Sequence, residues 1–198
     1  MKILLTGANG QFGKAFLSIK PLKIDNHSIE LIDFGAAENM RLIEADIPTP
    51  GPGQIVVKNK AIGLNYLDTY FRTGLYPWPN QEKIKIPGSE GVGHVHSTGF
   101  NVKFLKEGDK VSYVCPVGAY SEYALINESH AVQIKVDVDD HDVAAVTLKG
   151  LTTHYLLHLT FKLESGMTAL CHAAAGGVGQ LMGQWGSEIG ATMIGTAG

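Results

Sequence analysis

Apolar and polar residues alternate in short runs from about residue 28 to residue 136. Clusters of glycine and proline, of which Pro48–Gly53 is the densest, separate these runs, and no long helical stretch intervenes. Such short alternating runs, bounded by turn residues, are typical of the strands of a small β-barrel. The pattern predicts strands at Ser28–Ile32, Met40–Glu44, Gln54–Ile62, Gly88–Val95, Lys110–Val114, Gly118–Ile126 and Ala131–Val136.

Helical spacing replaces the alternation after residue 138. Asp139 is expected to cap the first helix, with Asp142 three residues on as the acidic partner of a variant capping box. The apolar face is interrupted at Lys149-Gly150 and resumes from Leu151 to Phe161. The pattern therefore predicts a pair of linking helices within residues 139–165.

The end of the chain, residues 166–198, reads as a strand, a glycine-rich turn, a helix and a second strand. Met167–Cys171 is short and apolar, as a buried parallel strand should be. Apolar residues recur at helical spacing over Gly179–Ile189, and Ala191–Ile194 is a second strand candidate. This order is that of one βαβ unit.

The turn of this unit, His172–Gly179, carries the dinucleotide-binding fingerprint with its first glycine replaced by Ala174. The first position makes the tight turn, Gly176 lets backbone N–H groups approach a pyrophosphate, and Gly179 lets helix and strand pack closely. The N–H groups and positive end of the helix would then hold the phosphates. The alternative is a glycine–alanine turn that serves packing alone.

A second strand–glycine–helix opening occupies residues 1–22, with Thr6–Gly13 as its glycine motif. It resembles the start of the short-chain or extended reductases, closest to dTDP-4-dehydrorhamnose reductase. No acidic ribose ligand and no Tyr-x-x-x-Lys motif follows, so we interpret residues 1–22 as a stray or fused segment. The alternative is a working second nucleotide site in a short-chain-type reductase.

The amino-acid composition limits the classes of binding partner and the cellular compartment that the sequence favours. The net charge is −3 and no block of lysine or arginine stands out, so neither nucleic acid nor a membrane surface is an expected partner. Cys115 and Cys171 lie in no metal-binding spacing and fit a reducing compartment. The sequence shows no apolar run long enough to span a bilayer and no secretory start. We therefore expect a soluble, cytoplasmic protein.

Four separated motifs, in the right order, carry a resemblance to a known family. They are Asn59–Pro77, Pro87–Gly93, Leu148–Leu157 and His172–Gly179. Together they resemble the NADPH-dependent quinone oxidoreductases, a zinc-free branch of the medium-chain dehydrogenase/reductase superfamily, over about Ser28 to Gly198. The resemblance implies an α/β plus β fold: a GroES-like β-barrel substrate domain (28–138), then the first βαβ unit of an incomplete Rossmann domain (166–198).

The resemblance also implies chemistry and site residues. Hydride would pass from NADPH to a quinone or a related enone, and full-length family members would be homodimers. Residues implied beside the nicotinamide and its ribose are Asn65, Tyr66, Asp68 and Tyr70. Residues implied near the cofactor on the linking helix are Thr152 and Tyr155. Those implied at the pyrophosphate are Gly176, Gly177 and Val178, and those implied at the wall of the quinone pocket are Tyr70 and Tyr76.

The residues themselves leave alternatives open at these positions. Amide, carboxylate and phenol groups in the short loop Asn65–Tyr70 can bind ribose hydroxyls and an amide. The same residues are equally compatible with a capped helix whose aromatic side chains lie in the core. For Thr152 and Tyr155, burial on a helix face is the corresponding alternative.

No metal is expected. The zinc-dependent members of the superfamily carry histidine in place of Ser89, a cysteine near Asn65–Asp68 and a four-cysteine loop. His94 and His96 share one face of a predicted strand, yet no third ligand is evident. The sequence identifies no catalytic acid or base, so the reaction would depend on positioning the hydride donor against the acceptor. His172 is expected to be a structural hydrogen-bond donor.

The length of the last segment raises a further expectation. A Rossmann domain has two βαβαβ halves, whereas residues 166–198 hold one βαβ unit. The residue that distinguishes NADPH from NADH contacts the ribose 2′ position and is expected roughly 20 residues after the glycine turn, about where this sequence stops. The expectation of NADPH rather than NADH therefore rests on the resemblance. We therefore expect a truncated or fused chain. The alternative function is an inactive remnant that folds as a barrel and binds nucleotide weakly at most.

Overall fold

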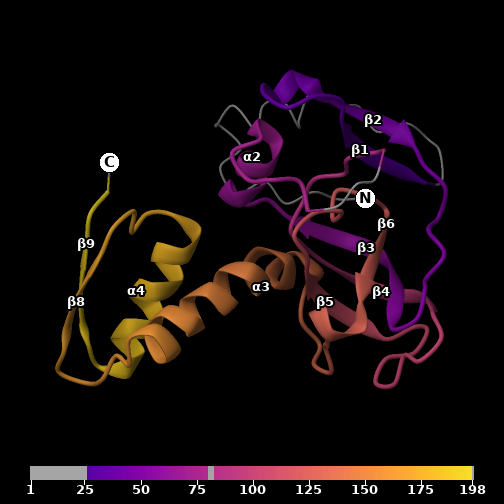
Figure 1. Ribbon diagram of the computed structural model, residues 1–198. Coiled ribbons are helices and arrows are strands. Elements are labelled where there is room, and N and C mark those ends of the chain that lie inside the picture. The colour runs from indigo at the N-terminus through magenta and orange to yellow at the C-terminus, as the bar shows by residue number, and fades with distance from the viewer. Residues whose placement is uncertain (1–25, 80–82, 198) are drawn as a thin grey trace. The chain divides into compact units, whose positions relative to one another are not determined.

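The computed structural model describes residues 26–79 and 83–197 of the chain (Figure 1). The described chain divides into a first unit that ends at Ala145 and a second unit, Val146–Gly198. Each is described by itself. The glycine motif in residues 6–13 lies outside the described residues, so the interpretation of that segment stays a prediction. None of the described helices combines the length and apolar character that crossing a membrane requires.

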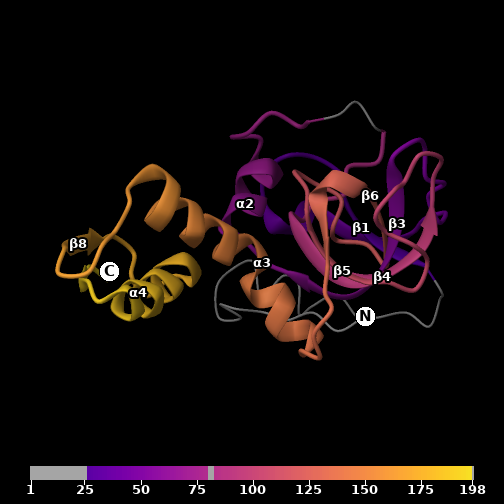
Figure 2. The ribbon, with the colours of Figure 1, turned by 90° about the horizontal axis from the view of Figure 1, so that it is seen from below.

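A curved antiparallel sheet forms the main layer of the first unit (Figures 1 and 2). Its strands within the described residues are β3 (Gln54–Gly63), β4 (Glu90–Thr98), β5 (Lys110–Val114), β6 (Tyr123–Asn127) and β7 (Ala131–Gln133). They lie in the order β6-β3-β4-β5-β7. Register shifts at Val56/Val57 and Asn59/Ala61 interrupt the pairing of β3 with β4, and such bulges bend a strand.

A second, two-stranded antiparallel sheet lies beside the first. It pairs β1 (His27–Leu31) with β2 (Met40–Glu44), joined through a short 3₁₀ turn at Ala37–Asn39. The backbone N–H of Ile29 donates to the carbonyl of Tyr120 (2.8 Å), which ties β1 to the segment before β6. Helix α2 (Tyr66–Thr73) follows β3 directly, and a second 3₁₀ turn covers Glu128–His130.

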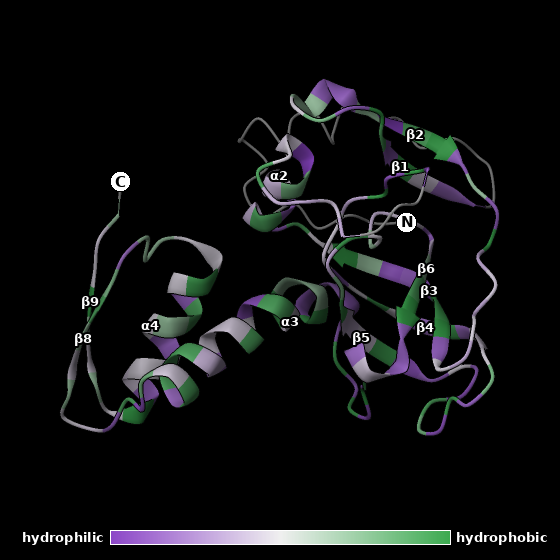
Figure 3. Cartoon of the chain, viewed as in Figure 1, coloured by the Kyte–Doolittle hydropathy of each residue, from purple (hydrophilic) through white to green (hydrophobic). Residues whose placement is uncertain are grey.

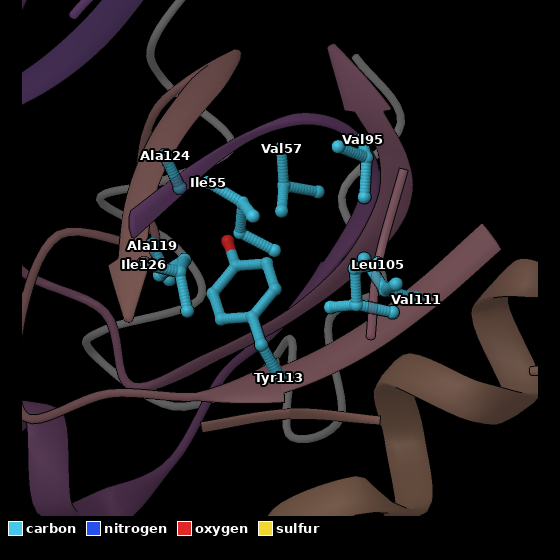
Figure 4. Close-up of a cluster of buried hydrophobic side chains, with 9 residues drawn as sticks. All are labelled: Ile55, Val57, Val95, Leu105, Val111, Tyr113, Ala119, Ala124 and Ile126. Carbon is cyan, nitrogen blue, oxygen red and sulfur yellow. The ribbon is translucent and has the colours of Figure 1, made fainter. Parts of the chain in front are cut away.

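One core cluster of the first unit consists mostly of residues on one face of the main sheet (Figure 4). Its members are Ile55, Val57, Val95, Leu105, Val111, Tyr113, Ala119, Ala124 and Ile126. Tyr113 lies at the centre, and its hydroxyl donates to Oδ1 of Asn59 (2.9 Å), whose amide in turn donates to the carbonyl of Ser121 (2.8 Å). Burial alternates as predicted in β6, whereas β3 buries Ile55, Val56 and Val57 in succession.

Two predicted strands are shorter than expected. The strand predicted at Gly118–Ile126 begins only at Tyr123, because Gly118 has a positive φ of 109° and Tyr120 directs its N–H to the carbonyl of Pro87 (2.9 Å). The last strand ends at Gln133 rather than Val136. The first stretch is a turn rather than a strand because it bonds to the Pro87 segment and to itself, with the hydroxyl of Ser121 donating to the carbonyl of Gly118 (2.9 Å).

The predicted pair of linking helices is wrong. Helix α3 runs without a break over Asp140–His154 and passes into a π-helical segment at Tyr155–Thr160. A glycine inside a helix costs only about 1 kcal/mol, so Gly150 weakens the helix without ending it. The expected cap is confirmed, since Oδ1 of Asp139 accepts the backbone N–H of His141 (2.8 Å).

The second unit contains the predicted strand–turn–helix–strand order. Strand β8 (Thr168–Cys171) pairs in parallel with β9 (Thr192–Gly195), and helix α4 (Gly177–Ile189) connects them. Gly190 ends α4 in the left-handed conformation (φ 88°) and returns its N–H to the last turn. Apolar side chains are spread along α3 and α4, as the hydropathy colouring shows (Figure 3).

Candidate functional site

The first group of candidate residues lies at the start of α2. Asn65 precedes the helix, and its backbone N–H donates to Oδ2 of Asp68 (2.9 Å), while the N–H of Asp68 returns to the carbonyl of Asn65 (3.1 Å). The side-chain amide of Asn65 donates to Oε1 of Glu90 on β4 (2.8 Å). Asn65 as a residue is half-buried, and the bond to Glu90 fixes the orientation of its carboxamide.

Asp68 is buried, with 1% of its surface exposed. The hydroxyl of Ser89 donates to Oδ1 (2.6 Å) and that of Tyr120 donates to Oδ2 (2.6 Å), in addition to the backbone N–H of Asn65. Burial raises the pKa of Asp68 above its ordinary value, and the hydrogen bonds from Ser89, Tyr120 and Asn65 oppose this. Its position is that of a support for the Asn65 corner, and direct contact with a cofactor ribose stays an untested prediction.

Glu90 completes this corner from the β4 side. Its side chain is fully buried and lies against Gly63, where a Cβ atom would sit 2.1 Å from Oε1 of Glu90. Gly91, the next residue, meets Tyr113 in the same way, because a Cβ there would lie 2.5 Å from the tyrosine hydroxyl. The two glycines therefore allow strand and side chains to approach more closely than any other residue permits.

The chemistry around Ser89 differs from that of a metal centre. Its hydroxyl is engaged with Asp68 and with the carbonyl of Pro116 (3.3 Å). Burial raises the pKa of the nearby Cys115 thiol to about 12, so the thiol stays protonated at neutral pH. Within residues 26–79 and 83–197, no group of three or more His, Cys, Asp or Glu side chains could hold a metal ion.

The tyrosines of the candidate site form an aromatic surface on α2 and the loop after it. The ring centroids of Tyr66 and Tyr70 are 5.5 Å apart, and those of Tyr70 and Tyr76 are 5.2 Å apart. Tyr66 is 77% exposed and Tyr76 44%, whereas Tyr70 is half-buried between them. The ring of Phe71 packs edge-on against that of Tyr76, with the ring centroids 5.7 Å apart. The two predicted pocket residues, Tyr70 and Tyr76, are thus brought together.

The glycine turn lies between β8 and α4 in the second unit. Ala173 takes a positive φ of 53°, one residue before the position predicted to make the tight turn. Gly176 caps α4, and its N–H donates to the carbonyl of Ala173 (2.9 Å), so this N–H is used within the turn. The next N–H groups, those of residues 177–179, belong to the first turn of the helix, which offers them no intrahelical acceptor.

Gly179 has the packing role predicted for it. A Cβ atom there would lie 2.5 Å from the carbonyl oxygen of Ala173 and 2.6 Å from Cα of Ala174. Such distances exclude any side chain, so the helix begins directly against the turn. Gly179 itself is buried by this contact, whereas Gly176 and Gly177 are exposed, so the start of α4 presents backbone without side chains at these two residues, as an anion-binding site requires.

Lys149 is the residue that sequence reasoning missed at this turn. A Cβ atom at Gly177 would lie 2.8 Å from Cδ and 3.0 Å from Cε of Lys149, so the aliphatic chain of this lysine passes over the start of α4. The sequence showed Lys149 only as an interruption of an apolar helix face. That interruption was the available signal, but nothing in it pointed to a residue 28 positions further on.

Three further candidate residues are Thr152, Tyr155 and His172. Thr152 donates its hydroxyl to the carbonyl of Leu148 (2.8 Å), one turn back along the helix, and Tyr155 begins the π-helical segment, about half exposed. Their contact with a cofactor stays a prediction. Nδ1 of His172 lies 3.0 Å from Oγ1 of Thr196, a structural hydrogen bond whose direction depends on the tautomer, so the expected donor role stays a prediction.

Comparison with known proteins relates both units to one enzyme group. Residues 51–136 match the alcohol dehydrogenase GroES-like domain. The chain is 44% identical over 172 residues to the quinone oxidoreductase of Pseudomonas aeruginosa and 40% identical over 174 residues to quinone oxidoreductase 1 of Escherichia coli. This chain is thus similar in sequence to the quinone oxidoreductases over part of their length. It spans about half the length of these relatives, 51% and 52%, while the alignments cover 85% and 86% of the chain itself.

Solved structures give the same relation for the fold. The quinone oxidoreductase of Pseudomonas syringae pv. tomato superposes with a TM-score of 0.84 at 42% identity, over 87% of this chain and 53% of that one. The Escherichia coli quinone oxidoreductase complexed with NADPH superposes with a TM-score of 0.80 at 38% identity, over 87% and 52%. The predicted fold class is confirmed: a GroES-like domain is followed by part of a Rossmann-like sheet.

Proposed function

We propose that this chain is the substrate domain and first nucleotide-binding unit of an NADPH-dependent reductase that acts on a quinone or a related electron-poor enone. The observation that carries the proposal is the bare N-terminus of α4, packed directly on its turn at Gly179 and flanked by Lys149. Two similar structures, from Escherichia coli and a mycobacterium, are described as complexes with NADPH. A relative 39% identical, from a Burkholderia species, is a 2-haloacrylate reductase, which favours electron-poor C=C bonds among the acceptors.

The residues of the turn fit a dinucleotide diphosphate. The first N–H groups of α4, at Gly177, Val178 and Gly179, point out of the helix end, and the positive end of the helix dipole favours an anion there. The aliphatic chain of Lys149 passes over Gly177, so its ammonium group would add a positive charge to this part of the turn. Gly176 leaves room for the phosphates because it carries no side chain. Its own N–H is already bonded to a carbonyl within the turn.

The first unit would supply the surface for the reacting partners. The Asn65 carboxamide, oriented by Glu90, is a fixed donor and acceptor for an amide or a ribose hydroxyl. Tyr66, Tyr70 and Tyr76 offer aromatic faces on which a planar acceptor can stack. NADPH, when bound, supplies the hydride. The contribution of the chain is to bind, orient and exclude water, and no side chain is assigned as a proton donor.

Titration of the purified chain with NADPH, followed by nicotinamide fluorescence, tests the proposal. We expect saturable binding that Gly176→Asp weakens, because its side chain starts 3.1 Å from the carbonyl of Ala173 and brings a negative charge to the phosphates. Gly183→Ala, on the same helix and with nothing within 4 Å, is the matched control. Equal affinity of Gly176→Asp and the unaltered chain would contradict the assigned site. Binding without NADPH oxidation in the presence of a benzoquinone would favour the alternative of a non-catalytic nucleotide-binding remnant.

A further inference from the structure

Three aromatic rings of the second unit form a cluster that the proposed reaction does not use. His154 is the last residue of α3, His158 lies in the π-helical segment, and Trp185 lies on α4. The ring centroids of the two histidines are 5.0 Å apart, and those of His154 and His158 lie 5.9 and 5.2 Å from that of Trp185. His154 is exposed and His158 half-buried, so solvent reaches the pair.

The spacing of the two histidines is that of a chelating pair. Residues four apart on a helix share one face, which is how two histidines of a helical His-x-x-x-His sequence bind the same zinc ion. An ion about 2.0–2.1 Å from one nitrogen of each ring, with the two rings in adjacent coordination positions, places the ring centroids roughly 4.5–5 Å apart. The observed 5.0 Å matches this separation without any movement of the helix.

We propose that His154 and His158 form a two-histidine site for a divalent transition-metal ion. Imidazole suits Cu²⁺, Ni²⁺ and Zn²⁺, and Cu²⁺ is bound most tightly of these in the general order of stability. The described residues contain no third His, Cys, Asp or Glu that would complete a metal-binding group, so water fills the remaining positions. The site is therefore open and exchangeable rather than structural.

Trp185 both supports and reports this site. Its indole packs against the two rings at 5.9 and 5.2 Å, which restricts their motion and lowers the entropy lost on chelation. An ion between the rings lies close enough to the indole for Cu²⁺ to quench its fluorescence. Because only neutral imidazole is a ligand, the affinity falls as the pH is lowered.

The test uses the full chain with Trp78→Phe, which leaves Trp185 as its only tryptophan. Titration with CuCl₂ near neutral pH, in a buffer that does not chelate copper, is expected to give saturable quenching with one ion per chain. His154→Gln and His158→Gln should each weaken the affinity at least about tenfold, the lower range for disturbing a metal site. His141→Gln, which removes a histidine paired with Asp139 in the first unit, is the matched control and should leave the affinity unchanged.

Electron paramagnetic resonance of the copper-loaded chain provides a second measurement, and its first result, two equivalent nitrogen ligands in the unaltered chain, needs no variant to fold. The hyperfine pattern should simplify in either glutamine variant. A spectrum with one nitrogen ligand or none would overturn the proposal. Quenching that persists unchanged in both His154→Gln and His158→Gln, checked as folded by circular dichroism, would overturn it as well.

Discussion

Removal of the Tyr120 hydroxyl tests the buried support of the Asn65 corner. Tyr120→Phe keeps a fully buried ring in place, so the packing of the first unit is preserved while Asp68 loses one of its two side-chain donors. A hydrogen bond to a charged group contributes about 1.5–3 kcal/mol to stability. With an unfolding slope of about 2 kcal/mol per molar urea, the midpoint should fall by about 1 M.

The effect of pH on this variant has a definite sign. Burial raises the pKa of Asp68 above 3.8, and the hydrogen bond from Tyr120 lowers it, so the variant carries a higher pKa still. A carboxyl whose pKa is raised in the folded state costs stability above that pKa. The cost vanishes as the pH falls through the folded pKa toward the unfolded value. The difference between variant and unaltered chain should therefore be larger at pH 8 than at pH 4.

Urea unfolding at both pH values, followed by the fluorescence of Trp78, measures this difference. Trp185→Phe in both proteins removes the signal of the second unit. Tyr123→Phe, a tyrosine on β6 outside the Asp68 cluster, is the control for loss of a hydroxyl and should unfold with the unaltered chain. An unchanged midpoint for Tyr120→Phe at pH 8, or an equal loss at both pH values, would refute the reasoning.

Three further variants probe other contacts. Gly179→Ala should destabilise the second unit and weaken NADPH binding, because the added Cβ has no room. Gly183→Ala should instead stabilise α4 by up to about 1 kcal/mol. Thermal melts and the NADPH titration compare the two variants. Lys149→Met should weaken NADPH binding at low salt and Lys149→Arg should retain it, with a difference that shrinks as salt is added. Although burial acts to raise it, the backbone N–H groups of residues 103–105 hold the pKa of Glu128 below 4.5. Its stabilisation is thus lost as the pH falls through that lowered pKa, and Glu128→Gln should flatten the acid limb of the stability curve by about 1 kcal/mol.

The sequence predicted most strands because short apolar runs are bounded by turn residues. Gln54–Gly63 and Lys110–Val114 lie within a residue of the predicted ranges, although both bury three successive residues rather than alternate ones. The errors fall where backbone conformation decides instead. Gly118 turns the chain before β6, and Gly150 stays helical because the surrounding turns outweigh its low propensity.

The candidate site was less accessible to prediction from the sequence. The glycine turn could be identified because each glycine position of the fingerprint implies a particular backbone geometry. Gly179 has the close contact predicted for it. At Asn65–Asp68 the choice between a capped helix and a polar binding loop could not be made, and the structure shows that capping and burial occupy Asp68 while Asn65 still reaches the surface. Lys149 was out of reach because its contact with Gly177 joins distant parts of the chain.

The close contacts of Gly63 with Glu90 and of Gly91 with Tyr113 limit the substitutions that this sequence can accept during evolution. A methyl group at position 91 has room only if the side chain at position 113 is shortened at the same time, whereas one at position 63 meets the carbonyl oxygen of Ala144 as well as Glu90. Single substitutions at either glycine lead to a misfit, so neutral drift at position 91 has to pass through a paired exchange. A library that randomises 91 together with 113 should recover folded variants that randomising 91 alone does not.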